Sequence, residues 1–413
     1  MAAPSRTEGQ KAGVVRPLVV FLVTLIIAGF ALIKTVGFVL AQSYPELALQ
    51  FSPGNVKALD AKSAAFIDGS AVGDTPATQG VADAVKLARR ALDREPSDVP
   101  ALRNLALYEL SVDNKIKAAS LFNAAHALSR RDFETELWTI EDRVAHNDID
   151  GALTHYDHAL RTTPEAATVL LPVLAKATLN PDIQPSVVRL LQRRPLWRNR
   201  FLWVFLGLEL SPATIAQFMD ALGLDPRKDV DRAYLQNAVA RLAAAGEPAH
   251  ALALIYSDQR RDHWPLLRNG HFRKPNIYVP LDWELAADAD LSGLVDRVPG
   301  IGPALSITAR NGSRGNVARQ VVALKPGAYS LTFSSGGASG SSGQITLNLT
   351  CMAGEGSSLL HWSRSAAGEQ QREILHFEVP KGCSGQAFTI TASPSPDGVI
   401  QGTWVTDLVF KRG

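Results

Sequence analysis

Two cysteines are the side chains of this 413-residue sequence whose type and spacing most directly predict a covalent bond. Cys351 ends an alternating apolar stretch, and Cys383 lies in a Lys-Gly-Cys-Ser-Gly turn before another. In an oxidising compartment such a pair forms a disulfide, and closing a loop of ~30 residues stabilises a fold by ~3 kcal/mol. The alternative is two separate buried thiols. No activating histidine motif accompanies either residue, so we expect no catalytic thiol.

Signatures of the common enzyme classes are missing from the sequence. It has no G-x-S-x-G elbow, P-loop or H-E-x-x-H helix, and the Gly-Ile-Gly within 298–303 opens a β-region that offers no helix N-terminus to a phosphate. Asp282 and Glu284 fall on one strand face, but nothing indicates that they flank a cleft. We therefore expect no catalytic residue, no cofactor and no enzymatic activity. A net charge of +2, from 42 basic and 40 acidic residues, gives no reason to expect a nucleic-acid partner.

Histidines in the middle of the chain raise the question of a metal site. His155 and His158 are three residues apart, on one face of a predicted helix, which is the spacing of a metal-binding pair. His126 and His146 lie elsewhere in the same region, and the sequence offers no carboxylate or cysteine that completes a convincing ligand set. We therefore expect a solvent-exposed pair and no metal site.

One apolar run near the N-terminus is long enough to cross a membrane. Residues 18–40 make 23 residues interrupted only by Lys34, and a bilayer core of ~30 Å needs about 20 at 1.5 Å each. Three basic residues precede the run and one acidic residue opposes them. The positive-inside rule then predicts a cytoplasmic basic tail over 1–17, a single-pass signal anchor over 18–40, and export of the rest.

A cleaved signal peptide is the alternative for this segment. Val39, Leu40 and Ala41 before Gln42 fit a small-residue cleavage site, although the apolar run exceeds the usual ~7–15 residues. Both interpretations place the bulk of the chain outside the cytoplasm. We expect a bacterial inner-membrane protein with a periplasmic body.

Residues 42–262 have the composition and periodicity of a helical repeat array. Ala-Leu-Asp-Arg-Glu-Pro ends at Pro96 and Ala-Leu-Arg-Thr-Thr-Pro ends at Pro164, a separation of 68 residues or twice 34. The pattern of small and bulky residues also repeats after 34 positions, as Ala118, Phe122 and Ala125 and then as Ala152, Tyr156 and Ala159. These segments resemble tetratricopeptide repeats, which stack helix pairs into a solenoid. The resemblance implies a scaffold that binds protein partners; residues 165–230 are helical but off this period.

Residues 263–413 change to short alternating strands with Gly and Pro turns. The predicted strands are 277–285, 304–309, 319–324, 328–333, 344–351, 359–362, 372–379, 387–392 and 403–410. We interpret residues 334–343, rich in Gly and Ser, as a hairpin loop. Such a series favours an antiparallel β-sandwich, most plausibly a jelly roll.

The opening of this region carries a second resemblance. Asn-Gly-His-Phe at 269–272, the stretch 279–285 with its tryptophan, and the stretch 320–331 look like a carbohydrate-binding module. Such modules often open with Asn-Gly-Asp-Phe, and in some of them this segment helps to hold a structural calcium. His271 stands where the acidic residue is expected, which puts a calcium site in doubt.

The resemblance implies a glycan-binding surface, which needs planar aromatic rings for the sugar faces and polar groups for the hydroxyls. The candidates are Trp283, Tyr329, His361, Trp362 and Trp404, with Arg319 and Gln320 as hydrogen-bond donors. Polar neighbours alternate with Trp362 and Trp404, so these two are the preferred rings. Trp283 and Tyr329 also fit positions that usually pack inside a sandwich.

The whole chain resembles membrane-anchored tetratricopeptide proteins of bacterial envelope polysaccharide systems. The sequence thus predicts a non-enzymatic scaffold that supports assembly or export of a surface polysaccharide, with repeats binding envelope proteins and the sandwich binding glycan. The alternative is a periplasmic protein-assembly adaptor whose β-domain also binds protein.

Overall fold

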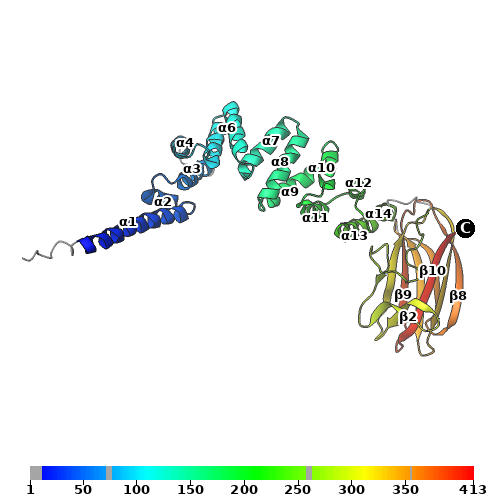
Figure 1. The fold of residues 1–413 in the computed structure, drawn as a ribbon. Coiled ribbons are helices and arrows are strands. Elements are labelled where there is room, and N and C mark those ends of the chain that lie inside the picture. The colour runs from blue at the N-terminus through cyan, green and yellow to red at the C-terminus, as the bar shows by residue number, and fades with distance from the viewer. Residues whose placement is uncertain (1–11, 71–76, 257–262, 354–355) are drawn as a thin grey trace, which may run out of the picture. The chain divides into compact units, whose positions relative to one another are not determined.

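The computed structural model describes residues 12–70, 77–256, 263–353 and 356–413. Helices make up the first part of the chain and strands the last (Figure 1). The residues divide into two compact units, Met1–Leu170 and Leu171–Gly413, and the boundary falls inside helix α9 (Ala166–Ala177). The predicted order of helical region and sheet region is therefore confirmed.

The first helix, α1 (Ala12–Leu40), contains the predicted span 18–40. Its segment Val23–Leu40 has a mean hydropathy of 2.3 and is 6% buried. By length and composition α1 can cross a membrane, either as an anchor or as a signal sequence. Of the predicted tail 1–17, residues 1–11 lie outside the described residues. Residues 12–17 already belong to the helix, which therefore begins before its apolar run.

Three helix pairs follow a short helix, α2 (Pro45–Phe51), in the first unit. The first helix of each pair packs against the second. The pairs are α3 (Val56–Ser70) with α4 (Ala77–Arg94), α5 (Val99–Ser111) with α6 (Lys115–Leu128), and α7 (Phe133–Ala145) with α8 (Ile149–Thr162).

The second and third pairs repeat after 34 residues. Asp98 and Asp132 cap α5 and α7 by accepting a hydrogen bond from a backbone N–H of the first turn. Asp113 and Asn147, in the turns within the pairs, both adopt a left-handed backbone with φ of 57° and 56°. The expected small and bulky residues are buried in both pairs: Ala118, Phe122, Ala125, Ala152, Tyr156 and Ala159. The repeat period is present, while the assignment to the tetratricopeptide family stays a prediction.

Helices of 8 to 16 residues open the second unit, and residues 165–230 are helical as expected. After α9 they are α10 (Gln184–Gln192), α11 (Arg198–Leu206), α12 (Pro212–Leu222), α13 (Asp229–Ala244) and α14 (Pro248–Ile255). Phe201 and Phe205 of α11 are fully buried, and the Phe205 ring lies 4.1 Å from that of Phe218 on α12. These aromatic contacts form the core between the short helices.

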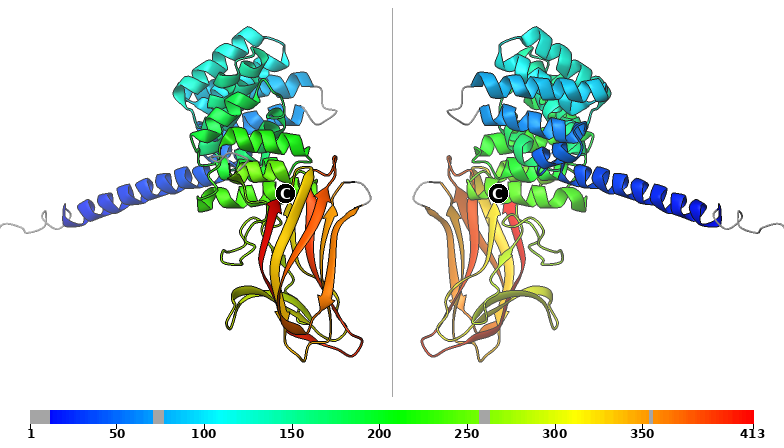
Figure 2. Two further views of the ribbon diagram at one scale, coloured as in Figure 1. Left: turned by 90° about the vertical axis from the view of Figure 1, so that its right-hand side faces the viewer. Right: turned by 90° about the vertical axis from the view of Figure 1, so that its left-hand side faces the viewer.

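The C-terminal strands form two five-stranded antiparallel sheets, whose strands run alongside one another in two layers (Figure 2). Sheet A has the order β1-β4-β9-β6-β7, with β1 (Glu284–Leu285), β4 (Gly315–Val322), β9 (Gln386–Pro394), β6 (Gly343–Cys351) and β7 (Ser358–Ser365). Sheet B has the order β2-β3-β10-β5-β8, with β2 (Leu291–Val298), β3 (Gly302–Ala309), β10 (Ile400–Arg412), β5 (Gly327–Gly337) and β8 (Gly368–Val379). The predicted sandwich is confirmed; its jelly-roll topology stays a prediction.

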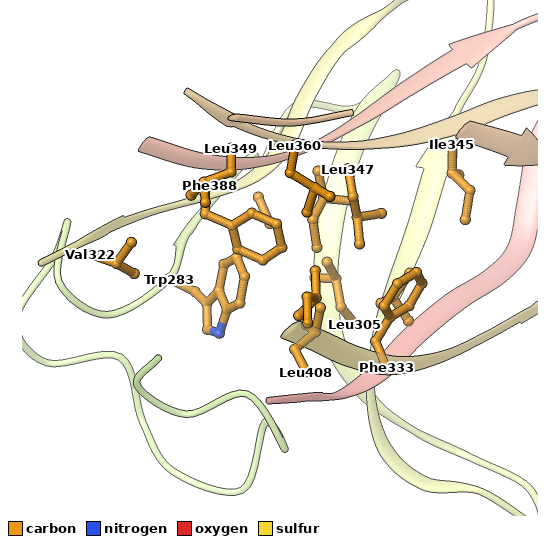
Figure 3. Close-up of a cluster of buried hydrophobic side chains, with 14 of the residues drawn as sticks. Trp283, Leu305, Val322, Phe333, Ile345, Leu347, Leu349, Leu360, Phe388 and Leu408 are labelled. Carbon is orange, nitrogen blue, oxygen red and sulfur yellow. The ribbon is translucent and has the colours of Figure 1, made fainter. Parts of the chain in front are cut away.

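Alternation along the strands buries one face of each sheet against the other. In β6 every second residue is buried, from Ile345 to Cys351. Trp283 lies at one end of this core, and its indole packs 5.8 Å from the ring of Phe388 (Figure 3). The inner faces are therefore apolar, and any binding site on a sheet has to use an outer face.

Three strand predictions need correction. Only Glu284 and Leu285 of the predicted strand 277–285 pair, because Pro280 cannot donate a ladder hydrogen bond within this stretch. Strand β2 was not predicted: only Gly293 of its eight residues is buried, so it lacks an apolar signature. The predicted loop 334–343 is partly strand, because β5 continues to Gly337.

Candidate functional site

The predicted disulfide is confirmed. Cys351 and Cys383 are bonded, with their Cα atoms 5.6 Å apart. Cys351 ends β6 opposite Gln386 of β9, so the bridge ties this strand pair to the turn before β9. The fully buried Gln386 amide donates to the carbonyl oxygen of Cys383 at 2.7 Å and accepts from the Leu324 N–H at 2.8 Å. The bridge is thus a structural element set among satisfied polar groups.

Three of the predicted glycan contacts belong to the core instead. Trp283 and Tyr329 are 1% and 3% exposed, because their side chains point between the sheets. Gln320 is fully buried and exchanges two hydrogen bonds with the backbone of Arg268, at 3.1 and 2.9 Å. These three residues contribute to the fold; Tyr329 also lines a cavity of about 570 Å³ beside α14.

Trp362 does not provide the exposed ring expected of it. It lies on the inward face of β7, packs against the core cluster, and makes an edge-to-face contact with Phe333 at a centroid separation of 4.8 Å. Polar residues do alternate with Trp362 along β7, but they face outward and Trp362 faces the core. Strands β7 and β8 also belong to different sheets, so the residues between the cysteines do not form a hairpin.

Arg319 and His361 both lie on the outer face of sheet A, with strands β9 and β6 between them. Register places them in one row across all five strands, in the order Glu284, Arg319, Thr389, Asn348, His361. Arg319 Nη1 lies 3.2 Å from Glu284 Oε2, and His361 Nδ1 lies 2.7 Å from Asn348 Oδ1. The only aromatic ring in this row is the His361 imidazole, so the row supplies mainly hydrogen-bonding groups and no indole or phenol ring for stacking on a sugar.

Trp404 lies on the opposite side of the sandwich, on the outer face of sheet B. Its neighbour Val405 points into the core, so the indole points outward, between Ser306 of β3 and Gly336 of β5. The indole lines a groove of about 520 Å³ and is 8% exposed. Trp404 is thus a predicted aromatic that the structure places in a groove on the outer face of a sheet, whereas Tyr329 lines a separate cavity beside α14.

The indole has room because Gly336 has no side chain. A methyl group on this glycine would lie 2.7 Å from Trp404 Cζ2 and 3.3 Å from the Gln370 Cα. Either distance is too short for a carbon contact, so the ring rests directly on the backbone of β5. The adjacent Gly337 also admits no Cβ, which would lie 1.8 Å from the Ala366 carbonyl oxygen.

Polar groups surround this groove. It is lined by residues of all five strands of sheet B and their turns, and the polar side chains among them are Asp296, Arg297, Ser306, Glu369 and Gln370. They supply both hydrogen-bond acceptors and donors beside one aromatic floor. These polar side chains were not predicted from the sequence. The Gly-Gly pair within a strand was the available signal, because glycine in a strand marks close approach of another group.

His271, in the opening loop 269–272, contacts the last strand of the sandwich. Its Nδ1 lies 2.6 Å from Asp407 Oδ1 in β10, and Leu408 N–H donates to the Gly270 carbonyl oxygen at 3.1 Å. Gly270 is required there, because a Cβ would lie 1.9 Å from the Leu408 carbonyl oxygen. The histidine therefore fastens the loop to the last strand with an imidazole where an acidic residue was expected.

The Asp282 carboxylate, considered above as half of a catalytic pair with Glu284, is 3% exposed and is fully engaged inside the fold. Arg268 Nε donates to its Oδ1 at 2.8 Å, and the Tyr278 N–H donates to its Oδ2 at 2.7 Å. Glu284, by contrast, is exposed and paired with Arg319. The two carboxylates thus have separate structural partners.

No protein-family model matches the chain, and no curated protein matches it. Solved structures similar to it include carbohydrate-binding modules. The module TmCBM61, solved with β-1,4-galactotriose, is 16% identical with a TM-score of 0.27, over 36% of this chain and 99% of that one. A CBM4 module is 14% identical with a TM-score of 0.28, over 36% and 99%.

The enzymatically active domain of tailspike protein 4 from bacteriophage CBA120 is also similar. It is 12% identical with a TM-score of 0.28, and the match covers 36% of this chain and 21% of that domain. The chain therefore spans about a fifth of the tailspike domain, but nearly all of each module. At these TM-scores, the ligand of this chain has to be argued from its own residues.

Proposed function

We propose that this chain is a non-catalytic, membrane-anchored envelope protein whose β-sandwich binds a glycan in the Trp404 groove and whose helical repeats bind protein. The observation that carries the glycan proposal is an indole seated in a groove of about 520 Å³ among five polar side chains. A sugar ring has an apolar face that stacks on an aromatic ring and hydroxyls that need donors and acceptors. An aromatic floor with a few convergent polar groups supplies both.

The first test is glycan-array binding by the full chain in detergent, with the hits quantified by calorimetry. Trp404→Ala is expected to weaken binding by about 10-fold or more, because it removes the stacking surface. Trp203→Ala is the matched control, because it removes a half-exposed indole from α11, away from both sheets. His361→Ala tests the polar row of sheet A. Unchanged binding by Trp404→Ala, or a larger loss with His361→Ala, would move the site away from the groove.

The proposal of protein partners rests on a groove in the first unit. The first helices of three successive pairs, α3, α5 and α7, line a hollow of about 230 Å³. Ile67, Leu107 and Trp138 give it an apolar surface, and Glu134 and Glu141 add negative charge. This composition suits an apolar peptide that carries a basic residue.

Pull-down with the full chain tests this surface. Leu107→Asp, which places a charge in the hollow, is expected to abolish capture of the partner, whereas Leu294→Asp on the sandwich is expected to preserve it. Partner capture that survives Leu107→Asp and is lost with Leu294→Asp would assign protein binding to the sandwich instead.

The proposed cellular role is support of surface-polysaccharide assembly or export at a bacterial inner membrane, with the N-terminus cytoplasmic. It follows from combining α1 as an anchor with a glycan groove and a peptide groove on one chain. Deletion of the gene is expected to change the amount or length of the surface polysaccharide, and unchanged polysaccharide would refute the role. A reporter active outside the cytoplasm, fused after Gly413, is expected to be active. A mature protein beginning at Gln42 would replace the anchor by a cleaved signal sequence.

A protein-assembly adaptor is the second candidate, and one observation favours it. Leu294 on β2 and Ile374 on β8 are 62% and 59% exposed on the same outer face as Trp404. Exposed aliphatic residues on a sheet are typical of a protein contact. Ile374→Asp separates the two candidates, because it should abolish binding of a protein to this face while leaving a glycan bound at Trp404 within about threefold.

A further inference from the structure

Three consecutive helices of the first unit bring a carboxylate and two imidazoles together. His126 comes from α6, Glu136 from α7 and His155 from α8. His126 Nδ1 lies 3.2 Å from Glu136 Oε1, and His155 Nδ1 lies 2.8 Å from Glu136 Oε2. One ligand atom from each residue lies within 4.8 Å of the other two. His155 is buried and lies beside the Glu136 carboxylate, so the expectation of a solvent-exposed histidine pair without a carboxylate partner is wrong.

The cluster has unused bonding capacity. Glu136 is fully buried, and among the described residues its Oε1 has no hydrogen-bond partner. The same holds for His126 Nδ1, which is close to that oxygen but not aligned for a hydrogen bond. His158 Nδ1 is also buried without a partner, with its ring 5.8 Å from that of His155. Buried polar atoms are normally satisfied, so three such atoms in one place point to a missing group.

We propose that His126, Glu136 and His155 bind a divalent transition-metal ion, with Zn²⁺ as the best fit. Two imidazole nitrogens and a carboxylate oxygen are ligands that Zn²⁺ accepts, at about 2.0–2.2 Å. In a tetrahedron with such bonds, neighbouring ligand atoms are about 3.3 Å apart. The two imidazoles lie 3.2 and 2.8 Å from the two different oxygens of Glu136, and one ligand atom of each residue lies within 4.8 Å of the others, so rotation of these side chains has to bring the three ligand atoms to that spacing. This site is independent of the glycan groove and of the peptide hollow.

Access and ligand chemistry agree with this assignment. The side chain of His126 is 24% exposed, which gives the ion and a fourth ligand, water, a route from solvent. A metal requires neutral imidazoles, which histidine supplies near neutral pH. A mixed N/O set favours Zn²⁺, Co²⁺ or Ni²⁺ over Ca²⁺ or Mg²⁺, which prefer oxygen alone. The ion would link α6, α7 and α8 across two successive helix pairs.

The experiment uses the full chain in detergent, with a tag that contains no histidine, after removal of metal with a chelator. Titration with Zn²⁺ is expected to give one ion per chain at micromolar affinity or tighter. Co²⁺ in place of Zn²⁺ is expected to give the visible absorption of a tetrahedral site. Hydrogen exchange with Zn²⁺ is expected to slow in α6, α7 and α8 and to stay unchanged in the β-sandwich.

Variants decide whether these residues are the ligands. His126→Gln and Glu136→Gln are expected to weaken Zn²⁺ binding by about 100-fold or more, because loss of a ligand exceeds the 10–100-fold effect of outer partners. His146→Ala is the matched control, since this exposed histidine ends α7 and lies outside the cluster. His126→Gln keeps the test valid if the buried Glu136→Gln fails to fold. Wild-type affinity in His126→Gln, or an equal loss in His146→Ala, would overturn the proposal.

Discussion

The β-sandwich and the first helical unit differ in how completely some of their buried carboxyl and amide side chains are hydrogen-bonded. In the sandwich, the Asp282 carboxylate accepts hydrogen bonds from Arg268 and from two backbone N–H groups, and the Gln386 amide is bonded to three backbone groups. In the first unit, Asp60 Oδ1 and Glu136 Oε1 are buried and have no hydrogen-bond partner among the described residues.

This difference separates polar groups that only stabilise the fold from polar groups that can take up a proton or bind a cation. A satisfied buried group holds one conformation, and removing one member leaves the others unpaired. An unsatisfied carboxylate is destabilised in its charged form, so it takes up a proton or binds a cation. Substitutions in the sandwich should therefore act on stability, whereas those in the helical unit should act on pH or metal dependence.

The largest effect is expected for Asp282→Ala. It leaves the Arg268 guanidinium and two backbone donors without their acceptor, and breaking a buried ion pair costs about 3–5 kcal/mol. We expect faster hydrogen exchange throughout sheets A and B and no change in α3 to α8. Asp397→Ala, which removes an exposed carboxylate before β10, is the control. Equal stability of the two variants would contradict a structural role for Asp282.

Cys351→Ser is expected to cost the sandwich about 3 kcal/mol, because it opens a loop whose ends lie 32 residues apart. The described ranges contain cysteine only at the two bridged positions, so the helical units should keep their stability. Mass spectrometry of non-reduced peptides checks the bridge directly. Free alkylation of both thiols in the exported protein, without reductant, would show that the bridge is absent.

The strands that sequence predicts and those it misses differ in what specifies them. Strands β3 to β10 carry period-two apolar patterns that each segment displays by itself. Strand β2 has only one buried residue, Gly293, and its polar residues Asp296 and Arg297 are exposed. It pairs with β3 at the edge of sheet B. Local pattern thus predicts strands with several fully buried residues and misses β2, whose Leu291 and Val295 are only partly buried against the core.

The predictions of glycan-binding residues were wrong for a related reason: local pattern does not tell which face of a strand is covered. Trp362 and Trp404 have the same alternating context, yet one faces the core and the other faces outward, and a shift of one residue would exchange them. Only the pairing of strands decides which face is covered. The histidine cluster was missed because its carboxylate, Glu136, is on a different helix, 19 residues before His155. The 34-residue repeat predicts that these helices stack, but not which side chains meet.

The free energy of unfolding of the first unit should depend on pH through a buried carboxyl group, that of Asp60. Burial, and then the charge of Asp98, raises the pKa of Asp60 from 3.8 to about 8. The folded chain therefore keeps this proton up to about pH 8, whereas the unfolded chain loses it above about pH 4. Unfolding releases a proton between these limits, so this group stabilises the fold fully at low pH and ceases to do so as pH rises towards 8.

Asp60→Asn removes this contribution. Relative to wild type, the variant is expected to gain about 1–2 kcal/mol between pH 5 and pH 8, less than a full one-proton slope because solvent and Arg103 screen the carboxyl. Hydrogen exchange in α3 and α5 measures it without interference from the sandwich. Parallel pH profiles in the two proteins would show that Asp60 is ionised in the fold. The buried Glu136, whose pKa burial also raises, should leave a residual slope of the same sign.

The smallest effect is expected for Arg319→Ala, and it provides the sharpest contrast with Asp282→Ala. Both substitutions remove one partner of an arginine–carboxylate pair of the same sandwich. The Arg319 and Glu284 side chains are 35% and 54% exposed, so water replaces the lost contact, and such pairs are worth about 0.2–1 kcal/mol. Unfolding in added salt is the check, because salt should weaken the Arg319 pair and leave the buried pair of Arg268 unaffected. A cost above 2 kcal/mol for Arg319→Ala would mean that exposure does not distinguish the two pairs. If glycan binding also fell, the polar row of sheet A, rather than the Trp404 groove, would be the surface that holds the sugar.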